Sequence, residues 1–250
     1  MSASSRHAFD RRLTPRPSAT TRRRVLGGAL ATGGAALLSA LGASPALASL
    51  NSDPILDFGD AAVGAERIGI AFYSNALGLA SPYGCPVDLA KGSLLNSSHR
   101  AYFQAALNQE TQHLATLLSL GLSFPYTTFT FPAGTFQSAP TMLSFGEQLE
   151  SIFIGAYLGA IKAAATEGGD LGITVAELAG QIVGIECEHR VLIRDINGED
   201  PPNDRFFEGD QTPGPNSTLG NTGTRSTVYA TGDDAVAALL ALGIVPGTTC

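Results

Sequence analysis

The chain has 250 residues, with 15 basic and 22 acidic side chains and a formal net charge of −7. Seven of the basic residues precede residue 49, so removal of that segment would leave eight basic and 21 acidic side chains, a net charge of about −13. A chain this acidic repels phosphate backbones, which disfavours nucleic-acid binding. The remaining 200 or so residues, rich in Ala, Leu, Ile and Gly, suffice for one hydrophobic core, so a single domain is expected.

The first 48 residues have the three parts of an export signal. Arginines crowd the start and end in Arg22-Arg23-Arg24, an uncharged stretch runs from Val25 to Leu41, and Ala46-Leu47-Ala48 matches an Ala-x-Ala cleavage site. Paired arginines directly before the apolar stretch are typical of the twin-arginine type. Because the stretch is short of the ~20 residues of a spanning helix and contains Gly and Thr, no stable membrane span is expected after cleavage. We predict a cleaved signal at 1–48 and a periplasmic, cell-surface or extracellular protein.

Four later segments repeat apolar residues at helical spacing: 57–79, 97–120, 138–165 and 174–196. Gly121 stands at the C-terminal cap of the second, and Gly168-Gly169 is expected to stop the third. Thr174 and Glu177 have the spacing of a capping box, which predicts the start of the fourth. The absence of a convincing strand pattern predicts an all-α four-helix bundle at 49–200.

The connections between these segments differ in length. The short link between the third and fourth makes those helices antiparallel neighbours. Residues 122–137 are rich in aromatic residues and proline, which favours extended chain, and at ~3.3 Å per residue they can span the length of a helix. We therefore expect a long crossover between the second and third helices. Residues 201–250 are expected to form an irregular extension packed on the bundle, with a short helix at 233–242.

The three cysteines, Cys85, Cys187 and Cys250, lack the paired spacing of a zinc site. Cys85 and Cys250 both lie in loop-like sequence. They are the pair expected to form a disulfide if the chain reaches an oxidising compartment.

Two Glu-x-x-His motifs, Glu110 to His113 and Glu186 to His189, lie on the second and fourth expected helices. Residues three apart share a helix face, so each motif directs a carboxylate and an imidazole to the same place. A single motif is weak evidence, but only three histidines follow residue 48 and two of them stand here. Both motifs lie on apolar stripes, where charged groups are costly unless they are paired or bound to a metal. A metal site is therefore expected.

The first and third helices each add a carboxylate. Glu66 is followed seven residues later by Tyr73, and Glu150 by Tyr157, so the chain repeats the series Glu, Tyr, Glu-x-x-His. Two hairpins related by a pseudo-twofold axis would bring four Glu and two His together, the ligand set of ferritin-like di-iron and di-manganese proteins. The predicted metal ligands are Glu66, Glu110, His113, Glu150, Glu186 and His189.

Other residues of these helices have alternative readings. Glu147, one turn before Glu150, is the competing ligand, although the tyrosine spacing favours Glu150. Tyr73 and Tyr157 are interpreted as packing and hydrogen-bonding residues rather than radical carriers. His99 is expected at the surface or in a cap.

The combined series resembles the ferritin-like domain family that includes plant desiccation-related proteins and twin-arginine-exported bacterial proteins. The residues that carry the resemblance are Glu66 with Phe72-Tyr73, Asn108-Gln109-Glu110-Thr111-Gln112-His113, Leu149-Glu150 with Ala156-Tyr157, and Glu186-Cys187-Glu188-His189. It spans about residues 55 to 200. The resemblance implies a ferritin-like bundle that holds two Fe or Mn ions.

Carboxylates with two imidazoles suit iron or manganese, and paired ions can share the electrons of a reaction with O2 or peroxide. We expect a dimetal oxidoreductase of the ferroxidase, peroxidase or catalase-like kind. The alternative is a non-enzymatic stress-related, desiccation-related or surface protein in which the metal site is a structural brace. The expected partners are metal ions and O2 or peroxide, and the sequence leaves a homo-oligomer open.

Overall fold

The part of the chain that the structure describes is almost entirely helical. The computed structural model describes residues 52–85, 94–203 and 228–247, within a unit that begins at Leu47. The predicted signal peptide at 1–48 lies outside the described residues. The described elements are α2 (Pro54–Leu77), α3 (Ser97–Ser119), β1 (Phe129–Thr130), α4 (Ala139–Glu167), α5 (Gly169–Ile196), α6 (Gly232–Ala241) and β2 (Val245–Pro246).

Local chemistry explains where α2 begins and ends. The Asp53 carboxylate accepts hydrogen bonds from the backbone N–H groups of Ile55 and Leu56, at 2.9 and 3.3 Å, and Pro54 occupies the first turn. The helix therefore starts three residues before the expected position. It ends at Gly78, which has a φ of 70° and forms a left-handed C-cap.

The predicted start of the fourth helix is wrong. α5 begins at Gly169 rather than at Thr174, because Gly168 and Gly169 both have positive φ and reverse the chain within one turn. Thr174 lies inside the helix, where its hydroxyl donates to the carbonyl of Asp170 at 2.8 Å. The proposed capping box is therefore an internal segment of α5.

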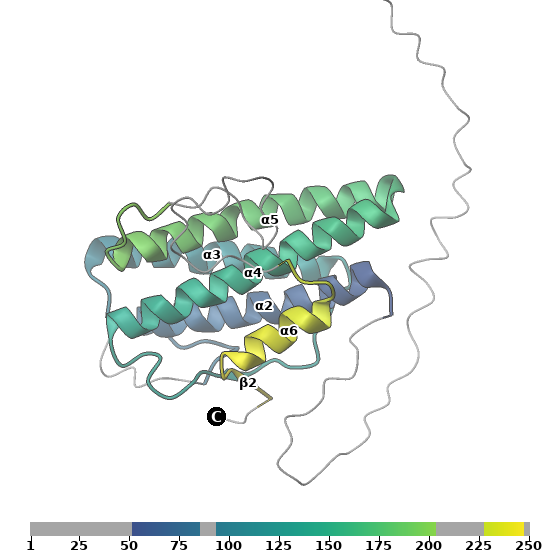
Figure 1. The fold of residues 1–250 in the computed structure, drawn as a ribbon. Helices are drawn as coiled ribbons and strands as arrows, with labels where there is room; N and C mark the ends of the chain where they lie inside the picture. Colours follow the sequence, from purple (N-terminus) through teal and green to yellow (C-terminus); the bar gives the residue numbers. More distant parts are fainter. Residues whose placement is uncertain (1–51, 86–93, 204–227, 248–250) are drawn as a thin grey trace, which may run out of the picture. The chain divides into compact units, whose positions relative to one another are not determined.

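The four long helices form two hairpins that pack face to face. α2 packs against α3 and α4 against α5, while α2 also contacts α4 and α3 contacts α5 (Figure 1). α2 and α4 run antiparallel, because Glu66 lies beside Tyr157 while Tyr73 lies beside Glu150. The prediction of an all-α four-helix bundle is confirmed.

The α3–α4 connection crosses the bundle along α2. Early in the crossover, Ser123 donates its N–H to the Asp60 carboxylate at 2.8 Å. Arg67, two turns further along α2, donates to two crossover carbonyls, and Phe131 then packs against Phe72 with ring centroids 6.3 Å apart. The crossover thus follows α2 from near its start to near its end, as its length predicted.

The C-terminal extension also packs against α2. α6 contacts α2 and α4, and Val236 and Leu239 are buried in the core (Figure 1). The N–H of Gly232 donates to the Asp57 carboxylate at 2.6 Å, and β2 pairs antiparallel with β1. The short helix expected at 233–242 is therefore present. Every residue from Ala61 to Leu77 except Arg67 is buried.

The structure describes only one of the two cysteines that are predicted to form a disulfide. Cys85 is disulfide-bonded. Cys250, its predicted partner, lies outside the described residues.

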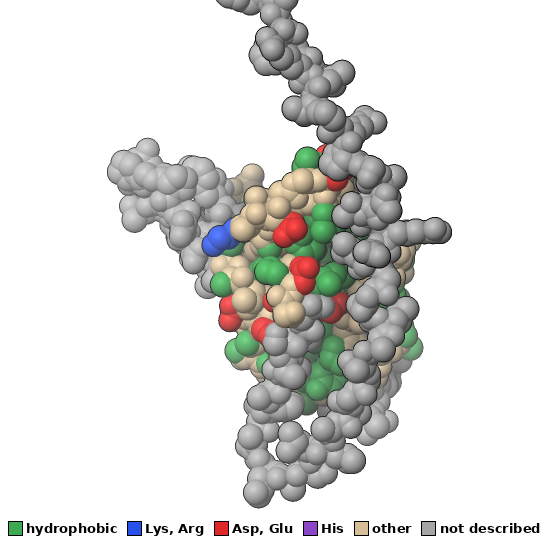
Figure 2. Space-filling view, turned by 90° about the vertical axis from the view of Figure 1, so that its right-hand side faces the viewer, with side chains coloured by type: hydrophobic (Ala, Val, Ile, Leu, Met, Phe, Trp, Pro, Cys, Tyr) green, Lys and Arg blue, Asp and Glu red, His purple; other side chains and the backbone are tan. Residues whose placement is uncertain are grey.

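Among the described residues, α4 is the one helix long and apolar enough to cross a membrane by composition. Of its apolar window, 61% is buried inside the protein, as for the core helix of a bundle. Figure 2 shows the end of this unit where α4 meets α5. Acidic side chains are scattered there among apolar and uncharged ones, and basic side chains are sparse.

Candidate metal centre

The four long helices bring six ionisable side chains together in the middle of the bundle. Their donor atoms fall into two overlapping groups, each with atoms within 4.8 Å of one another. One group contains Glu66, Glu110, His113 and Glu186; the other contains Glu110, Glu150, Glu186 and His189. All six predicted ligands lie in this cluster. Their role as ligands remains a prediction.

Glu110 and Glu186 belong to both groups because each presents one oxygen to each histidine. From Nδ1 of His113, the nearest oxygens of Glu110 and Glu186 lie at 3.8 and 3.2 Å. From Nδ1 of His189, the other oxygens of the same two carboxylates lie at 3.3 and 3.2 Å. Both carboxylates therefore stand between the two imidazoles.

Glu66 and Glu150 each belong to one group. Glu66 lies 3.4 Å from Nδ1 of His113, and Glu150 lies 3.8 Å from Nδ1 of His189. The cluster thus has two halves with the same composition. We call them the His113 position and the His189 position.

Two buried tyrosines orient the outer carboxylates. Tyr157 on α4 donates its hydroxyl hydrogen to Oε1 of Glu66 on α2, and Tyr73 on α2 donates to Oε1 of Glu150 on α4. Each bond crosses the α2–α4 interface and leaves the second carboxylate oxygen facing the cluster. The interpretation of these tyrosines as hydrogen-bonding residues fits this geometry.

The competing ligand Glu147 lies outside both groups. Its carboxylate accepts a hydrogen bond of 2.8 Å from the guanidinium of Arg194, which is 2% exposed and also pairs with Glu199 at 2.9 Å. Glu150 is fully buried among the cluster residues. The tyrosine spacing therefore singled out the residue of α4 that faces the cluster.

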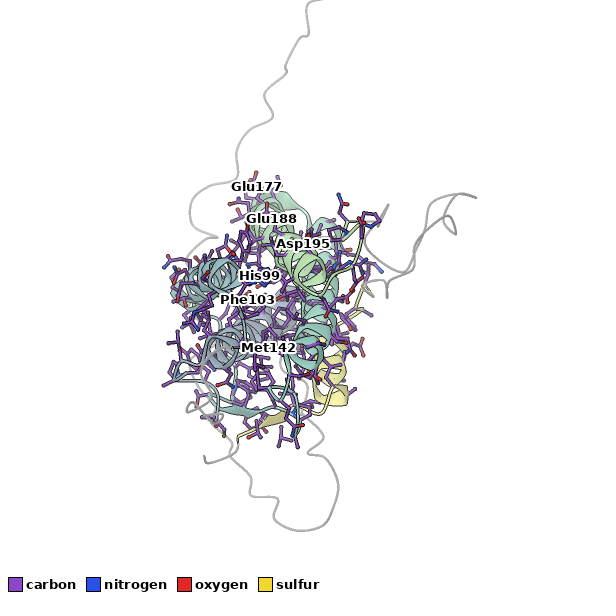
Figure 3. All side chains as sticks on the ribbon, turned by 90° about the vertical axis from the view of Figure 1, so that its left-hand side faces the viewer. His99, Phe103, Met142, Glu177, Glu188 and Asp195 are labelled. Carbon is purple, nitrogen blue, oxygen red and sulfur yellow. The ribbon has the colours of Figure 1, made fainter. Side chains whose placement is uncertain are left out.

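Two other residues, His99 and Glu188, lie outside the cluster. His99 is near the N-terminal cap of α3, where its N–H donates to Asn96 at 2.9 Å. Glu188 is exposed, on the side of α5 that faces away from the bundle interior, whereas Phe103 and Met142 lie among the helices (Figure 3).

Gln109 and Gly69, for which no role was predicted, both support the cluster. Oε1 of Gln109 lies 2.9 Å from Nε2 of His189, the ring nitrogen that points away from the carboxylates. A Cβ at Gly69 would lie 2.9 Å from the carboxyl carbon of Glu110. The sequence offered a hint for both residues. Gln109 directly precedes a motif glutamate. Gly69 lies in a helix interior, where glycine destabilises the helix and is therefore expected only where space is needed.

Burial and the repulsion between the carboxylates strongly affect the pKa values of the cluster residues. Burial, and then the charge of Glu186, raise the pKa values of Glu110 and Glu150 well above their usual range. Burial also acts to raise the pKa of Glu186, but the nearby imidazoles of His113 and His189 outweigh it and hold that pKa at about 2. Burial acts to lower the histidine pKa values, yet the closely packed carboxylates raise them to about 12 for His113 and about 9 for His189. Without a metal, the cluster therefore retains protons at neutral pH.

The pattern of unpaired atoms fits metal binding. Each of the four glutamates has at least one buried oxygen without a hydrogen-bond partner in the structure, and Nδ1 of His113 is likewise without one. Buried polar atoms are normally satisfied, so convergent unsatisfied ones call for a missing partner. Carboxylate oxygens and imidazole nitrogens are ligands for iron, manganese and zinc. This buried cluster could bind metal.

Comparison with known families agrees with this geometry. The family model of the ferritin-like domain matches residues 55–199, more than half of the chain and all four long helices. The chain belongs to the ferritin-like domain family. No curated protein and no solved structure matches it in the two other comparisons. In this ferritin-like protein the matched range contains every residue of the cluster, whereas α6 and its strand β2 lie outside it.

Proposed function

We propose that this ferritin-like protein binds two iron or manganese ions and uses them in redox chemistry with O2 or peroxide. The observation that carries the proposal is the placement of Glu110 and Glu186, each of which faces both histidines. A carboxylate in such a position can bridge two ions. Two bridges with one Glu and one His on either side make the ligand set of carboxylate-bridged dimetal proteins.

Each ion would have a defined set of ligands. At the His113 position, Glu66 and His113 would be terminal ligands, and at the His189 position Glu150 and His189 would play the same part. The tyrosine hydroxyls would hold Glu66 and Glu150 in place. Such supporting hydrogen bonds orient ligands and tune the metal.

The surroundings favour chemistry in a restricted space. All four glutamates are at most 1% exposed and His189 is 2% exposed, so bulk water is excluded from most of the cluster. Bound there, a pair of iron or manganese ions would supply the electron equivalents for a reaction with O2 or peroxide. The protein would position the ions and limit what reaches them.

The test combines metal analysis with turnover. The protein, purified from its own host, should contain about two iron or manganese ions per chain by elemental analysis and should consume peroxide or O2. Glu186→Ala should lose both metal and turnover, while His99→Ala should keep both. Metal-loaded protein that shows no turnover with either oxidant would remove the enzymatic part of the proposal.

A structural role for the metals is the second candidate. The specific observation in its favour is the number of buried cluster atoms that have no hydrogen-bond partner among the described residues. An ion that neutralises them binds the folded state alone and so adds its binding free energy to stability. A large fall in melting temperature on chelation, with no measurable turnover, would favour this structural role in a stress-related or surface protein.

We also propose that the chain is exported by the twin-arginine route. The paired arginines, apolar stretch and Ala46-Leu47-Ala48 site support this proposal. Sequencing the N-terminus of the protein from its host tests it. A mature chain that begins at Ser49 is expected, and replacement of Arg22, Arg23 and Arg24 by Lys should retain the precursor in the cell.

A further inference from the structure

The two halves of the cluster differ at the residue that precedes each shared glutamate. The repeat pairs Glu110 with Glu186 and His113 with His189, so it also pairs Gln109 with Ile185. A carboxamide therefore stands in one half where the other half has an aliphatic side chain. This difference breaks the pseudo-twofold symmetry beside the histidines.

Gln109 closes the cluster beside His189. Its Oε1 lies 2.9 Å from Nε2 of His189, so the imidazole can donate there while its Nδ1 faces the carboxylates. The edge of the Tyr73 ring also packs on this imidazole, with centroids 5.5 Å apart. His189 is held on both sides and is 2% exposed.

In the part of the chain that the structure describes, His113 has neither kind of support. Nε2 of His113 has no hydrogen-bond partner among the described residues, and its side chain is 13% exposed, against 2% for His189. Ile185, the counterpart of Gln109, cannot accept a hydrogen bond. The imidazole of His113 is therefore positioned less firmly, and it reaches the surface.

A groove of about 430 Å³ between α3 and α5 leads to His113. Its lining contains no charged side chain apart from the imidazole itself, and consists of Gln112, His113, Thr116, Leu178, Gln181, Ile182 and Ile185. Uncharged walls neither repel nor retain ions, and they suit small neutral molecules. The groove has room for several molecules the size of water or peroxide.

We propose that the two metal positions are unequal, and that the His113 position is the one that exchanges its ion and takes up a small neutral ligand through the α3–α5 groove. The His189 position keeps its ion. This inference rests on the proposed function, because it needs two bound ions. Supporting hydrogen bonds to metal-bound histidines change affinity by about 10- to 100-fold, so a difference at one residue suffices to separate the positions.

The first experiment is release of metal to a chelator. Protein loaded with Mn²⁺ is mixed with excess EDTA, and the Mn²⁺ that remains on the protein is measured by elemental analysis after rapid gel filtration at successive times. Release in two phases of equal amplitude is expected, the faster from the His113 position. Gln109→Leu should accelerate the slow phase by about tenfold and leave the fast one unchanged, while Ile185→Gln should slow the fast phase.

The second experiment tests the groove. Gln112→Trp should fill it and slow the fast phase several-fold without affecting the slow one. Gln104→Trp is the matched control, because Gln104 is an exposed residue of the same helix, outside the groove, that bonds to Asn108 at 3.3 Å. Nitric oxide, a small neutral molecule, serves as the ligand probe. Its binding to the Fe²⁺-loaded protein should be slowed by Gln112→Trp alone.

The outcomes separate this inference from the proposed function. Two bound ions released in a single phase, or a Gln109→Leu variant that accelerates the fast phase, would overturn the inequality of the positions and leave the dimetal centre intact. Equal slowing by Gln104→Trp and Gln112→Trp would overturn the access route. Protein that binds no metal at all would overturn both the inference and the proposed function.

Discussion

Tyr157 on α4 donates a hydrogen bond to Glu66 on α2, and 84 residues earlier in the chain Tyr73 makes the reciprocal bond from α2 to Glu150 on α4. Because each glutamate precedes its own tyrosine by two helical turns, one antiparallel helix pair satisfies both bonds at once. The repeat of Glu and Tyr in the sequence therefore predicts that α2 and α4 are antiparallel, and it also predicts two of the metal ligands.

Replacing Tyr157 by Phe should weaken the His113 position, because Glu66 loses the bond that orients it. Metal affinity there is expected to fall by at least about tenfold. Tyr73→Phe should have the same effect at the His189 position. Titration with Mn²⁺ measures both, and Tyr102→Phe, at a side chain that is 47% exposed, should leave both affinities unchanged.

Removal of one shared carboxylate should cost more metal than removal of one imidazole. Glu186 faces both histidines, so Glu186→Ala should bring metal content close to zero. His189→Ala should leave about one ion per chain. Elemental analysis of the purified variants checks this order, with His99→Ala as the control. Equal losses of metal in the two variants would contradict the prediction that Glu186 serves both metal positions.

Substitution of Glu147 is predicted to lower stability without loss of metal, whereas substitution of Glu150 is predicted to lower metal content. Glu150→Gln should lower metal content. Glu147→Ala should keep it, but removes a partner of the buried Arg194 guanidinium and should destabilise the fold by ~1–3 kcal/mol. Urea unfolding of the two variants measures the second effect. If Glu147→Ala lost metal and Glu150→Gln did not, the assignment of the α4 ligand would be reversed.

Gly69→Ala should damage the site although alanine favours helices. The added Cβ would lie 2.9 Å from the Glu110 carboxyl carbon, so that carboxylate must move and metal affinity should fall. Gly180→Ala is the matched control. A Cβ there meets nothing within 4 Å, and this change should stabilise the protein by ~0.5–1 kcal/mol. Thermal melting and metal titration of both variants distinguish the outcomes.

Metal binding should release protons and should strengthen as pH rises. The pKa values of His189 and His113 lie at about 9 and about 12, and those of Glu110 and Glu150 are raised, so a metal at pH 7 must displace protons. Between pH 6 and 8 both imidazoles are still protonated in the metal-free protein, so apparent affinity should increase throughout this range. Acidification on adding Mn²⁺ to weakly buffered protein, followed with an indicator dye, measures the release. An affinity independent of pH would contradict it.

The parts of the fold that the sequence predicts are those in which one short-range pattern decides the outcome. Periodicity located the long helices, and the spacing of Glu110 from His113 placed both on one face. The start of α5 was missed because two glycines allow the chain to reverse at once, so no separate capping residue is needed. The β1–β2 pairing was missed because strands of two residues carry no pattern of their own and exist only where the crossover meets the extension.

The candidate site shows a similar division. Its six predicted ligands follow from the repeated motif. The role of Gln109 does not, because it depends on which ring nitrogen of His189 points toward the carboxylates. The difference between Gln109 and Ile185 is visible in the sequence, yet it acquires meaning only when the groove beside His113 is known.

The enclosure of α2 has a consequence for how the protein opens. α2 is covered by its bundle neighbours, by the crossover and by α6, whereas α3 and α5 each expose an outer face. Amide hydrogens of α2 should therefore exchange with solvent only through global unfolding, and those of α3 through smaller, more frequent openings. Local opening of α3 would then expose the cluster on the side where His113 lies. The side of the cluster formed by α2 would remain closed until the whole bundle unfolds.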